Sequence, residues 1–368
     1  MIHAFKILKR KTLVRTTLAL AMFSAAVNAE PYIAVRTGFK CSQCHLNNIG
    51  GGGRTEYGQA YTQYKLVMKQ TQEAILSGRE GALTSFDPKL SDAVTIGSNF
   101  RMEQTAVQKN KSAPSNNQLG ISEGNVYINV ELVKNFLSFY TDIHVGASSG
   151  SREVWMMVRK LPLNSYVKVG KTLLPYGFRL MDDQAFIRDR TDYTYNNPAV
   201  AGEIGIEPGP VSLVTNLTND RSSTVGYVTY RRFRVGGSYG TSVKNAHTNK
   251  FDRYGPFVGV NLGKFTLLSE MDFIERAAGD STVKQTAQFY ELNFLPHQGL
   301  NFKGTYEYFD RNTTIANKRD GQDRITLGVE HFPVQFMQLG LYYRINRAMP
   351  QFESENQDMV IGRAQVFF

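Results

Sequence analysis

Apolar and polar side chains alternate along most of the chain from about residue 92 onward. The segment 125–133 (NVYINVELV) has an aliphatic side chain at every second position, and segments 300–310 and 339–346 repeat the alternation. Successive side chains of a β-strand point to opposite faces, so this period of two predicts strands. We expect sixteen of them, at 92–107, 122–133, 137–147, 152–160, 165–171, 202–207, 210–217, 223–231, 233–241, 255–262, 264–274, 284–294, 299–309, 323–332, 335–345 and 357–368.

The predicted strands favour an antiparallel transmembrane β-barrel over a soluble fold. Their polar faces carry charges, and their apolar faces are rich in aromatic residues at the strand ends, as in a barrel that shows its apolar face to lipid. The last strand ends at Phe368, which resembles the C-terminal signature of bacterial outer-membrane barrels. Sixteen is an even number, as such barrels require, and the uncertain division around 207–211 (EPGPV) leaves fourteen open. A secreted β-sandwich is the alternative.

The N-terminus predicts an export signal over residues 1–29. A basic stretch precedes a short apolar run (TTLALAMFSAAV), and small residues follow, so that cleavage after Ala29 is expected. The run is too short to span a bilayer as a helix. Five of the 42 Lys and Arg residues lie in this segment, which holds no acidic residue, so half of the formal net charge of +10 belongs to it. The charge therefore gives no reason to expect a nucleic-acid partner.

Composition after the signal supports the barrel. The chain has 23 Phe and 19 Tyr but one Trp, and 32 Gly but only 12 Pro. An exported chain rich in aromatic residues and glycine, without long apolar runs, fits an outer-membrane barrel better than a soluble enzyme.

The alternation stops between residues 172 and 201. Loops of this length are usually functional or disordered, and the Tyr, Arg and Asp content of this one argues against simple disorder. We expect it to fold into the barrel lumen, with an ordinary extracellular loop as the alternative. Asp182, Asp183, Arg188 and Asp189 are candidates for lining the lumen.

The only two cysteines, Cys41 and Cys44, are followed directly by His45. C-x-x-C-H is the attachment signature of c-type haem: the two thiols bind the haem edge covalently and the histidine is the proximal iron ligand. A structural disulfide would not need His45, and a thioredoxin-like pair would need a βαβ context, which is absent. A zinc site would need further nearby ligands. We therefore expect one covalently attached haem c.

The residues after the motif are interpreted around this haem. The run Gly50–Gly53 lacks the Gly-Lys-Ser/Thr ending of a phosphate loop, and we expect it to turn tightly and lie against the porphyrin. Arg54 is a candidate partner for a haem propionate, with a solvated surface role as the alternative. Residues 55–76 predict one helix that packs Tyr61, Tyr64, Leu66 and Met68 around the cofactor.

The sixth iron ligand is less determined by the sequence. Met68 is the only methionine between residues 30 and 90 and is a candidate distal ligand, although a lone methionine on a helix is more often core. His144 is a second candidate, and an open or water-ligated iron is the third possibility.

An export signal, a C-x-x-C-H segment (PYIAVRTGFKCSQCH) and a sixteen-strand pattern that ends in phenylalanine together resemble the outer-membrane cytochrome–porin fusions, of which the iron-oxidising cytochromes are the best known. The resemblance implies a signal peptide at 1–29, a small α-helical mono-haem cytochrome segment at 30–90 and a porin-like barrel at 91–368. It also implies that the cytochrome sits in the lumen or at its periplasmic mouth.

The leading hypothesis is an electron-transfer protein of the bacterial outer membrane. Its partners would be periplasmic cytochromes or other carriers on one side, an extracellular donor or acceptor such as Fe(II) on the other, and outer-membrane lipid around the barrel. A solute-selective porin in which the haem segment is a structural or regulatory plug is the alternative.

Overall fold

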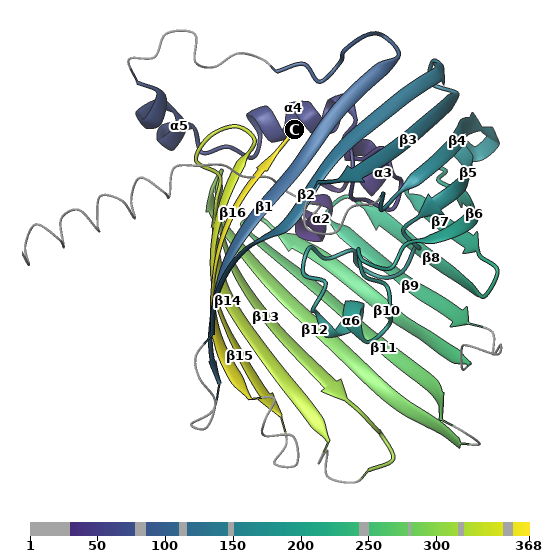
Figure 1. The fold of residues 1–368 in the computed structure, drawn as a ribbon, viewed down its shortest axis with the longest axis vertical. Helices are drawn as coiled ribbons and strands as arrows, with labels where there is room; N and C mark the ends of the chain where they lie inside the picture. The colour runs from purple at the N-terminus through teal and green to yellow at the C-terminus, as the bar shows by residue number, and fades with distance from the viewer. Residues whose placement is uncertain are drawn as a thin grey trace, which may run out of the picture.

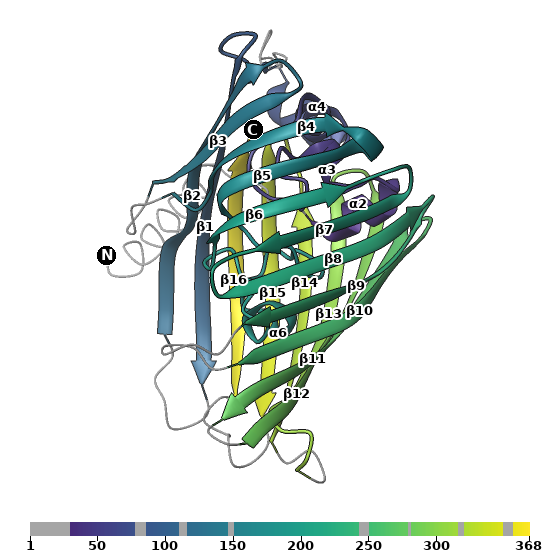
Figure 2. The same ribbon diagram turned by 90° about the vertical axis from the view of Figure 1, so that its right-hand side faces the viewer.

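The computed structural model describes residues 30–77, 86–109, 116–145, 151–242, 250–278, 281–315, 320–348 and 356–368, so the proposed signal at 1–29 lies outside it. Within these residues sixteen antiparallel strands close into one barrel, in which every strand pairs with its sequence neighbours and β1 pairs with β16 (Figures 1 and 2). Sixteen strands, rather than fourteen, are therefore confirmed. The strands are β1 Val94–Lys109, β2 Asn116–Val133, β3 Leu137–His144, β4 Val154–Leu161, β5 Ser165–Thr172, β6 Ala199–Ile206, β7 Val211–Leu217, β8 Arg221–Tyr230, β9 Phe233–Ser242, β10 Phe251–Leu262, β11 Phe265–Ala278, β12 Ser281–His297, β13 Leu300–Asp310, β14 Gly321–His331, β15 Met337–Ala348 and β16 Gln357–Phe367.

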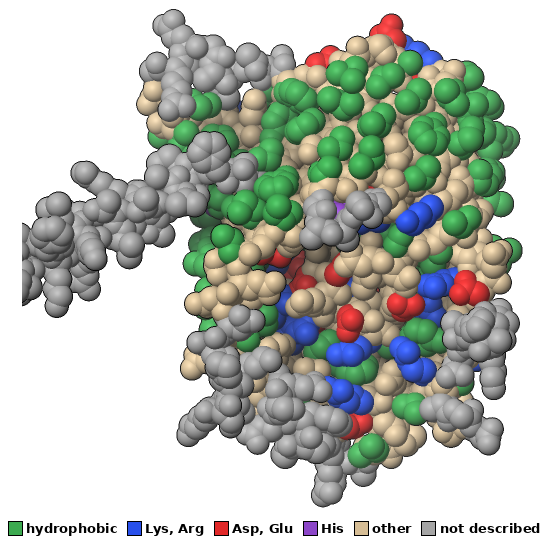
Figure 3. All heavy atoms as spheres, in the orientation of Figure 1, with side chains coloured by type: hydrophobic (Ala, Val, Ile, Leu, Met, Phe, Trp, Pro, Cys, Tyr) green, Lys and Arg blue, Asp and Glu red, His purple; other side chains and the backbone are tan. Residues whose placement is uncertain are grey.

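The two faces of the strands match the predicted barrel and exclude the sandwich. On β15, Arg344 and Asn346 are buried and point into the lumen, whereas Leu341 is 55% exposed on the outside. Figure 3 shows hydrophobic side chains gathered in the upper half of the view, and charged ones in the lower half, where the same view in Figure 1 looks into the lumen. An outer apolar band around a polar interior is the surface of a transmembrane barrel.

The two ends of the barrel differ in their connections. At one end, which we call the turn end, the connections are short: residues 231–232 join β8 to β9, and 263–264 join β10 to β11. Phe368 also lies at this end. The other end, the loop end, carries the longer connections, including residues 173–198 between β5 and β6. Bacterial barrels place short turns in the periplasm and long loops outside, which assigns the turn end to the periplasm.

Residues 30–68, which we call the plug, lie inside the barrel near the turn end (Figure 1). The plug contains α2 Pro31–Thr37, α3 Cys41–Cys44 and α4 Glu56–Tyr64. Tyr32 and Val35 of helix α2 are buried. Val35 contacts Gly259 of β10 so closely that a Cβ added to Gly259 would lie 2.5 Å from Cγ2 of Val35. None of the described helices is long and apolar enough to cross a membrane.

The single helix predicted for residues 55–76 is wrong: α4 ends at Tyr64, and α5 begins at Lys69 and ends at Leu76. The barrel rim breaks it, because Gln298 donates hydrogen bonds from its amide to the carbonyls of Tyr64 and Val67. The N–H of Met68 donates to the carbonyl of Phe332 at 2.9 Å. These partners come from the turns that follow β12 and β14, so the helix is interrupted by tertiary contacts.

Candidate functional site

The motif residues Cys41, Cys44 and His45 form one short helix and its end. The N–H of His45 donates to the carbonyl of Cys41 at 2.9 Å, which closes the single turn of α3 and places both thiols on it. Both thiols are free and half-buried, so they form no disulfide. His45 then pairs with Arg54 in an antiparallel β-bridge, which fixes the chain direction after the motif. The motif is thus held by local hydrogen bonds that leave its thiols available.

The glycine run turns the chain as predicted but packs elsewhere. Gly50, Gly51 and Gly52 have φ angles of 90°, 83° and 63°, a region that residues other than glycine rarely adopt. A Cβ on Gly52 would lie 2.5 Å from the hydroxyl of Tyr140, which accepts a hydrogen bond from the N–H of Gly53 at 3.0 Å. The run therefore docks mainly on the barrel wall, and only Gly50 of the four glycines lines the cavity described next.

A cavity lies beside the motif and is lined by Cys41, Cys44 and His45; its space of about 1100 Å³ includes space open to solvent. We call it the main cavity. Its other walls are mostly apolar and come from the plug, from the barrel wall and from residues 176–179 of the long loop. They include Ile33, Ala34, Tyr61, Leu66, Phe178, Val214, Val225, Tyr227 and Phe257. Large, mostly apolar cavities with a few polar groups are typical of cofactor sites.

The polar groups of the main cavity are predominantly basic. Lys40, Arg54, Arg179 and Arg234 line it, and Glu30 is its one acidic lining residue. The described ion pairs assign no carboxylate to Lys40 or Arg234: Lys40 donates to the carbonyls of Glu207 and Val211, and Arg234 to the hydroxyl of Thr229 and the carbonyl of Phe39. Glu30 instead pairs with Lys303 of β13 at 2.8 Å. A large apolar cavity with surplus positive charge fits an apolar ligand that carries carboxylates.

The environment of the motif keeps His45 neutral. Burial, followed by the charge of Arg54, lowers the pKa of His45 to about 3, and the Gly51 backbone acts in the opposite direction. A histidine must be unprotonated to bind a metal. Burial and the neighbouring Cys41 raise the pKa of Cys44 to about 11, against the effect of Arg54. Arg54 itself is buried, and its guanidinium lies 4.7 Å from the ring centroid of Phe367.

The structure does not bring either candidate distal ligand to the main cavity. Met68 packs against Gly299 at the barrel rim, and Met68 and Tyr64 are absent from the cavity lining, whereas Tyr61 and Leu66 belong to it. His144 lies at the end of β3, where its Nδ1 is 2.9 Å from the amide oxygen of Asn125. Among the described residues, His45 is the only histidine or methionine that lines this cavity.

Residues 173–198, which we call the lumen loop, enter the barrel from the loop end as predicted (Figure 2). The N–H of Phe178 donates to Glu270 at 2.6 Å, and the N–H of Phe186 donates to Glu307 at 2.7 Å. The loop also meets the plug, because a Cβ on Gly51 would lie 3.0 Å from the ring of Tyr195. Plug and loop thus share the lumen.

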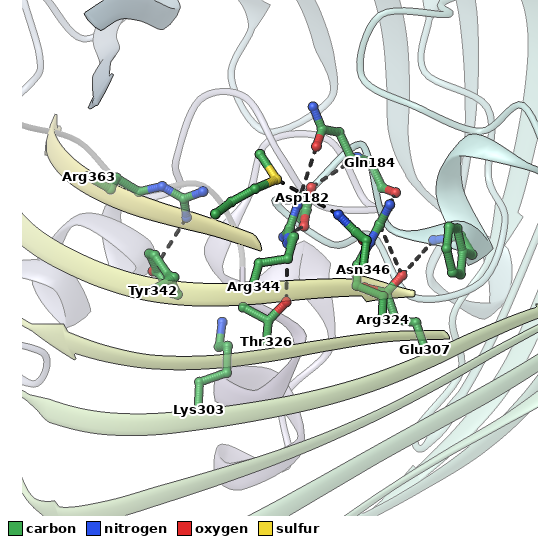
Figure 4. A network of polar contacts seen from close by, with 12 residues as sticks. Asp182, Gln184, Lys303, Glu307, Arg324, Thr326, Tyr342, Arg344, Asn346 and Arg363 are labelled. Atoms are coloured by element: carbon green, nitrogen blue, oxygen red, sulfur yellow. Dashed lines mark hydrogen bonds and ion pairs between the residues drawn. The ribbon is translucent and has the colours of Figure 1, made fainter. Parts of the chain in front are cut away.

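The four loop residues chosen from the sequence take different places. Asp182 pairs with Arg344 on β15, within a polar network that Figure 4 draws together with Gln184, Arg324 and Asn346. Asp183 accepts a hydrogen bond from the N–H of Tyr195 at 2.8 Å. Arg188 is fully buried and donates to the carbonyl of Tyr176, whereas Asp189 is half exposed beside Arg190. Only the first three are therefore held within the lumen.

A second cavity lies between the lumen loop and the wall formed by β1, β2 and β16; its space of about 820 Å³ includes space open to solvent. It is lined by charged pairs, among them Arg363 with Glu103 at 2.7 Å and Arg101 with Glu123 at 2.9 Å. Tyr195 lines this cavity while its ring also touches Gly51 of the plug. The second cavity is thus lined by charged side chains, whereas the walls of the main cavity are mostly apolar.

Sequence reasoning missed several residues of the main cavity, including Lys40, Arg179 and Arg234. Their residue types carry no motif. Arg234 alternates along β9 like any lumen-facing residue, so only the closed barrel shows that it faces the plug.

Comparisons with known proteins support the barrel architecture. No family model matches this chain, and the comparison with curated proteins finds no match either. Among solved structures, a loop-deletion mutant of OmpT from Vibrio cholerae is similar with a TM-score of 0.62 and 11% identity, over 75% of this chain and 99% of that one. An anion-selective porin from Comamonas acidovorans gives 0.58 and 12%, over 75% and 99%. The channel DcaP of Acinetobacter baumannii gives 0.52 and 10%, over 75% and 97%. At these identities the likeness shows a porin-like fold.

Proposed function

We propose that the chain is an outer-membrane electron carrier, with one haem c bound covalently to Cys41 and Cys44 in the main cavity and His45 as proximal iron ligand. Bound there, the haem would supply one-electron redox chemistry. The protein residues fix the thiols on α3, keep His45 neutral and surround the site with apolar walls. The observation that carries the proposal is the mostly apolar cavity, lined by basic side chains, directly beside the complete attachment motif.

The charge of the cavity supports the same assignment. Haem has a large apolar ring and two carboxylates, and the cavity pairs apolar walls with Lys40, Arg54, Arg179 and Arg234. Buried positive charge is costly unless it is matched by an anion or by hydrogen bonds. A ring that bears carboxylates would supply both apolar contact and negative charge.

The position of the plug supports a role in transfer across the membrane. The motif lies near the turn end, on the side assigned to the periplasm, where soluble carriers would exchange electrons with it. The lumen loop and the second cavity lie on the opposite side, toward an extracellular donor or acceptor. A barrel gives a charged cofactor a polar interior and separates it from lipid.

The test is covalent haem attachment followed by transfer. Protein made in cells that attach c-type haem should retain its haem through denaturing electrophoresis, and the variant C41A/C44A should not. In liposomes with an entrapped oxidant, external Fe(II) or another reductant should reduce the interior faster with the wild type than with C41A/C44A. Equal rates for the two proteins would reject electron transfer, and a wild type without covalent haem would reject the whole proposal.

A solute channel is the second candidate, and two observations favour it. The barrel has a porin-like fold, and the second cavity is polar, with arginine and carboxylate side chains around it. In this case the plug would have a structural or regulatory role. Conductance of wild-type protein in planar bilayers, compared with that of C41A/C44A, tests it: a stable solute-selective current together with no transbilayer electron transfer would favour the channel.

A further inference from the structure

Residues 176–179 of the lumen loop line the main cavity. This segment is held firmly by the wall. The N–H of Gly177 donates to Ser238 at 2.8 Å, and a Cβ on Gly177 would collide with the carboxylate of Glu270. The ring of Phe178 packs on Phe257 with a centroid distance of 4.8 Å. The next residue, Arg179, is therefore placed at the cavity by fixed neighbours.

Arg179 is buried, with 6% of its surface exposed, and its guanidinium is only partly satisfied. One nitrogen, Nη2, donates to the carbonyl of Leu174 at 2.7 Å, and the group lies 5.4 Å from the ring centroid of Tyr195. Within the described residues, Nε and Nη1 are buried without a hydrogen-bond partner. Leaving a buried charged donor unsatisfied costs several kcal/mol, as an order of magnitude. A bound anion that accepts hydrogen bonds from these two nitrogens would remove this cost.

Neighbouring protein groups do not supply that anion. Arg188 is a second buried cation close by: burial, followed by the charge of Arg179, lowers the pKa of Arg188 to about 10. Asp183, an acidic residue of the loop, accepts hydrogen bonds from the N–H of Tyr195 and the amide of Asn196. None of the ion pairs found among the described residues includes Arg179. Arg179, with two unpartnered buried donors, is thus a lining residue of a cavity whose proposed occupant has carboxylates.

We propose that Arg179 binds a carboxylate of the group that fills the main cavity, and so ties the lumen loop to the plug; this inference rests on the proposed function, in which that group is haem c and the carboxylate a propionate. A guanidinium presents paired donors in a plane that matches a carboxylate. The lumen loop would then be ordered fully only when haem is attached. Haem attachment and the closure of the barrel interior are thereby coupled through one side chain.

The test uses full-length haem-loaded protein and the variants R179Q and R179K, with R190Q as the matched control. Arg190 is on the same loop but stacks on Phe309 and is not part of the cavity lining. The readouts are the haem midpoint potential and amide hydrogen exchange over residues 174–181. A nearby positive charge favours the reduced haem, so R179Q should lower the midpoint potential. R179Q should also speed amide exchange over residues 174–181, because the loop loses its bond to the haem. Haem-free C41A/C44A should show the same faster exchange.

The variants separate charge from hydrogen bonding. R179K keeps the charge without the planar pair of donors, so we expect a potential near that of the wild type but faster exchange. R190Q should match the wild type in both measurements. If R179Q and R179K both match the wild type in potential and exchange, or if R190Q changes both as much as R179Q, the inference is overturned while the proposed function stands. A wild type that carries no covalent haem overturns both.

Discussion

Lys303 of β13 is the residue whose removal should most directly weaken the docking of the plug. Its Nζ lies 2.8 Å from Glu30 of the plug, 2.8 Å from Glu330 and 3.9 Å from Glu291, and it is shown among the lumen network in Figure 4. Lys303 also lies over the ring of Tyr32 at 5.4 Å. The variant Lys303→Met preserves most of the volume but removes the charge that three buried carboxylates share.

The expected cost follows from what is left behind. Removing one partner of a buried ion pair costs about 3–5 kcal/mol, because the remaining charge stays buried without compensation. That is a factor of roughly 100 to several thousand in the docking equilibrium. Burial raises the pKa of Glu30 to about 7, with Lys303 acting in the opposite direction. Without Lys303 this pKa should rise further, so the deficit should be largest above pH 8 and shrink toward pH 5 as the carboxylates take up protons.

Trp155 provides the assay, because it is the only tryptophan of the chain and reports on the plug. It is buried and stacks on Tyr140 at 4.6 Å, and Tyr140 accepts the hydrogen bond from Gly53. We would follow its fluorescence during urea unfolding in detergent, in the C41A/C44A background so that no haem quenches it. With an m-value of about 1–3 kcal/mol/M, the unfolding midpoint should fall by about 1–5 M in the Lys303→Met variant at pH 8.

Two controls make this prediction refutable. Lys250 pairs with Asp252 at 2.8 Å but is 64% exposed, so Lys250→Met should cost less than about 1 kcal/mol. The double variant E30Q/K303M should recover part of the loss, since one of the stranded carboxylates is then neutral. If Lys303→Met unfolds within about 1 kcal/mol of its parent at pH 8, the reasoning about the buried cluster is refuted.

Three further predictions test the plug and the barrel surface. Gly52→Val should destabilise docking of the plug by about 2–6 kcal/mol in the same urea assay, because it adds the strain of a positive φ and a collision with Tyr140. Gly209 also has a positive φ, 49°, but open space around it, so Gly209→Ala should cost at most about 1–3 kcal/mol. Equal losses in the two variants would contradict the argument from the Tyr140 contact. In haem-free C41A protein, alkylation of Cys44 at pH 8 should be slower than in urea, because burial, the largest cause of the raised pKa of this thiol, remains when Cys41 is removed and only the thiolate reacts. A native rate equal to the unfolded rate would exclude the buried thiol. Leu341→Arg should destabilise the folded barrel in lipid by about 2–4 kcal/mol if this position lies near the bilayer midplane. If the variant melts in liposomes at the same temperature as the wild type, Leu341 lies outside the apolar band.

The alternation of side chains was sufficient to predict every strand but not every strand end. The strand predicted to begin at residue 122 begins at Asn116 in the structure, and the one predicted for 284–294 runs from Ser281 to His297. Alternation comes from the contrast between lipid and lumen, and this contrast fades where strands extend beyond the bilayer. Backbone pairing continues there without a pattern in the side chains, so the sequence underestimates those strands.

The site shows a similar division between local and distant causes. The motif Cys41–His45 and the positive φ angles of the glycine run follow from short-range chemistry and are visible in the sequence. The contact of Gly52 with Tyr140, the break in the predicted helix at Met68 and the placement of Arg179 depend on residues far along the chain. A barrel brings such residues together by closing on itself, and closure leaves no local signature.

The arrangement of plug and loop explains why one side chain from a long loop bears on a motif far away in sequence. The plug is near the turn end and the lumen loop enters from the loop end, and among the described residues they meet around the main cavity and at the contact of Gly51 with Tyr195. The wall holds each of them separately, through Lys303 for the plug and through Glu270 and Glu307 for the loop. Because these anchors are independent, neither element needs the other to enter the barrel. In the proposed function, the haem in the main cavity would join them further, because the basic side chains that line the cavity could bind its carboxylates.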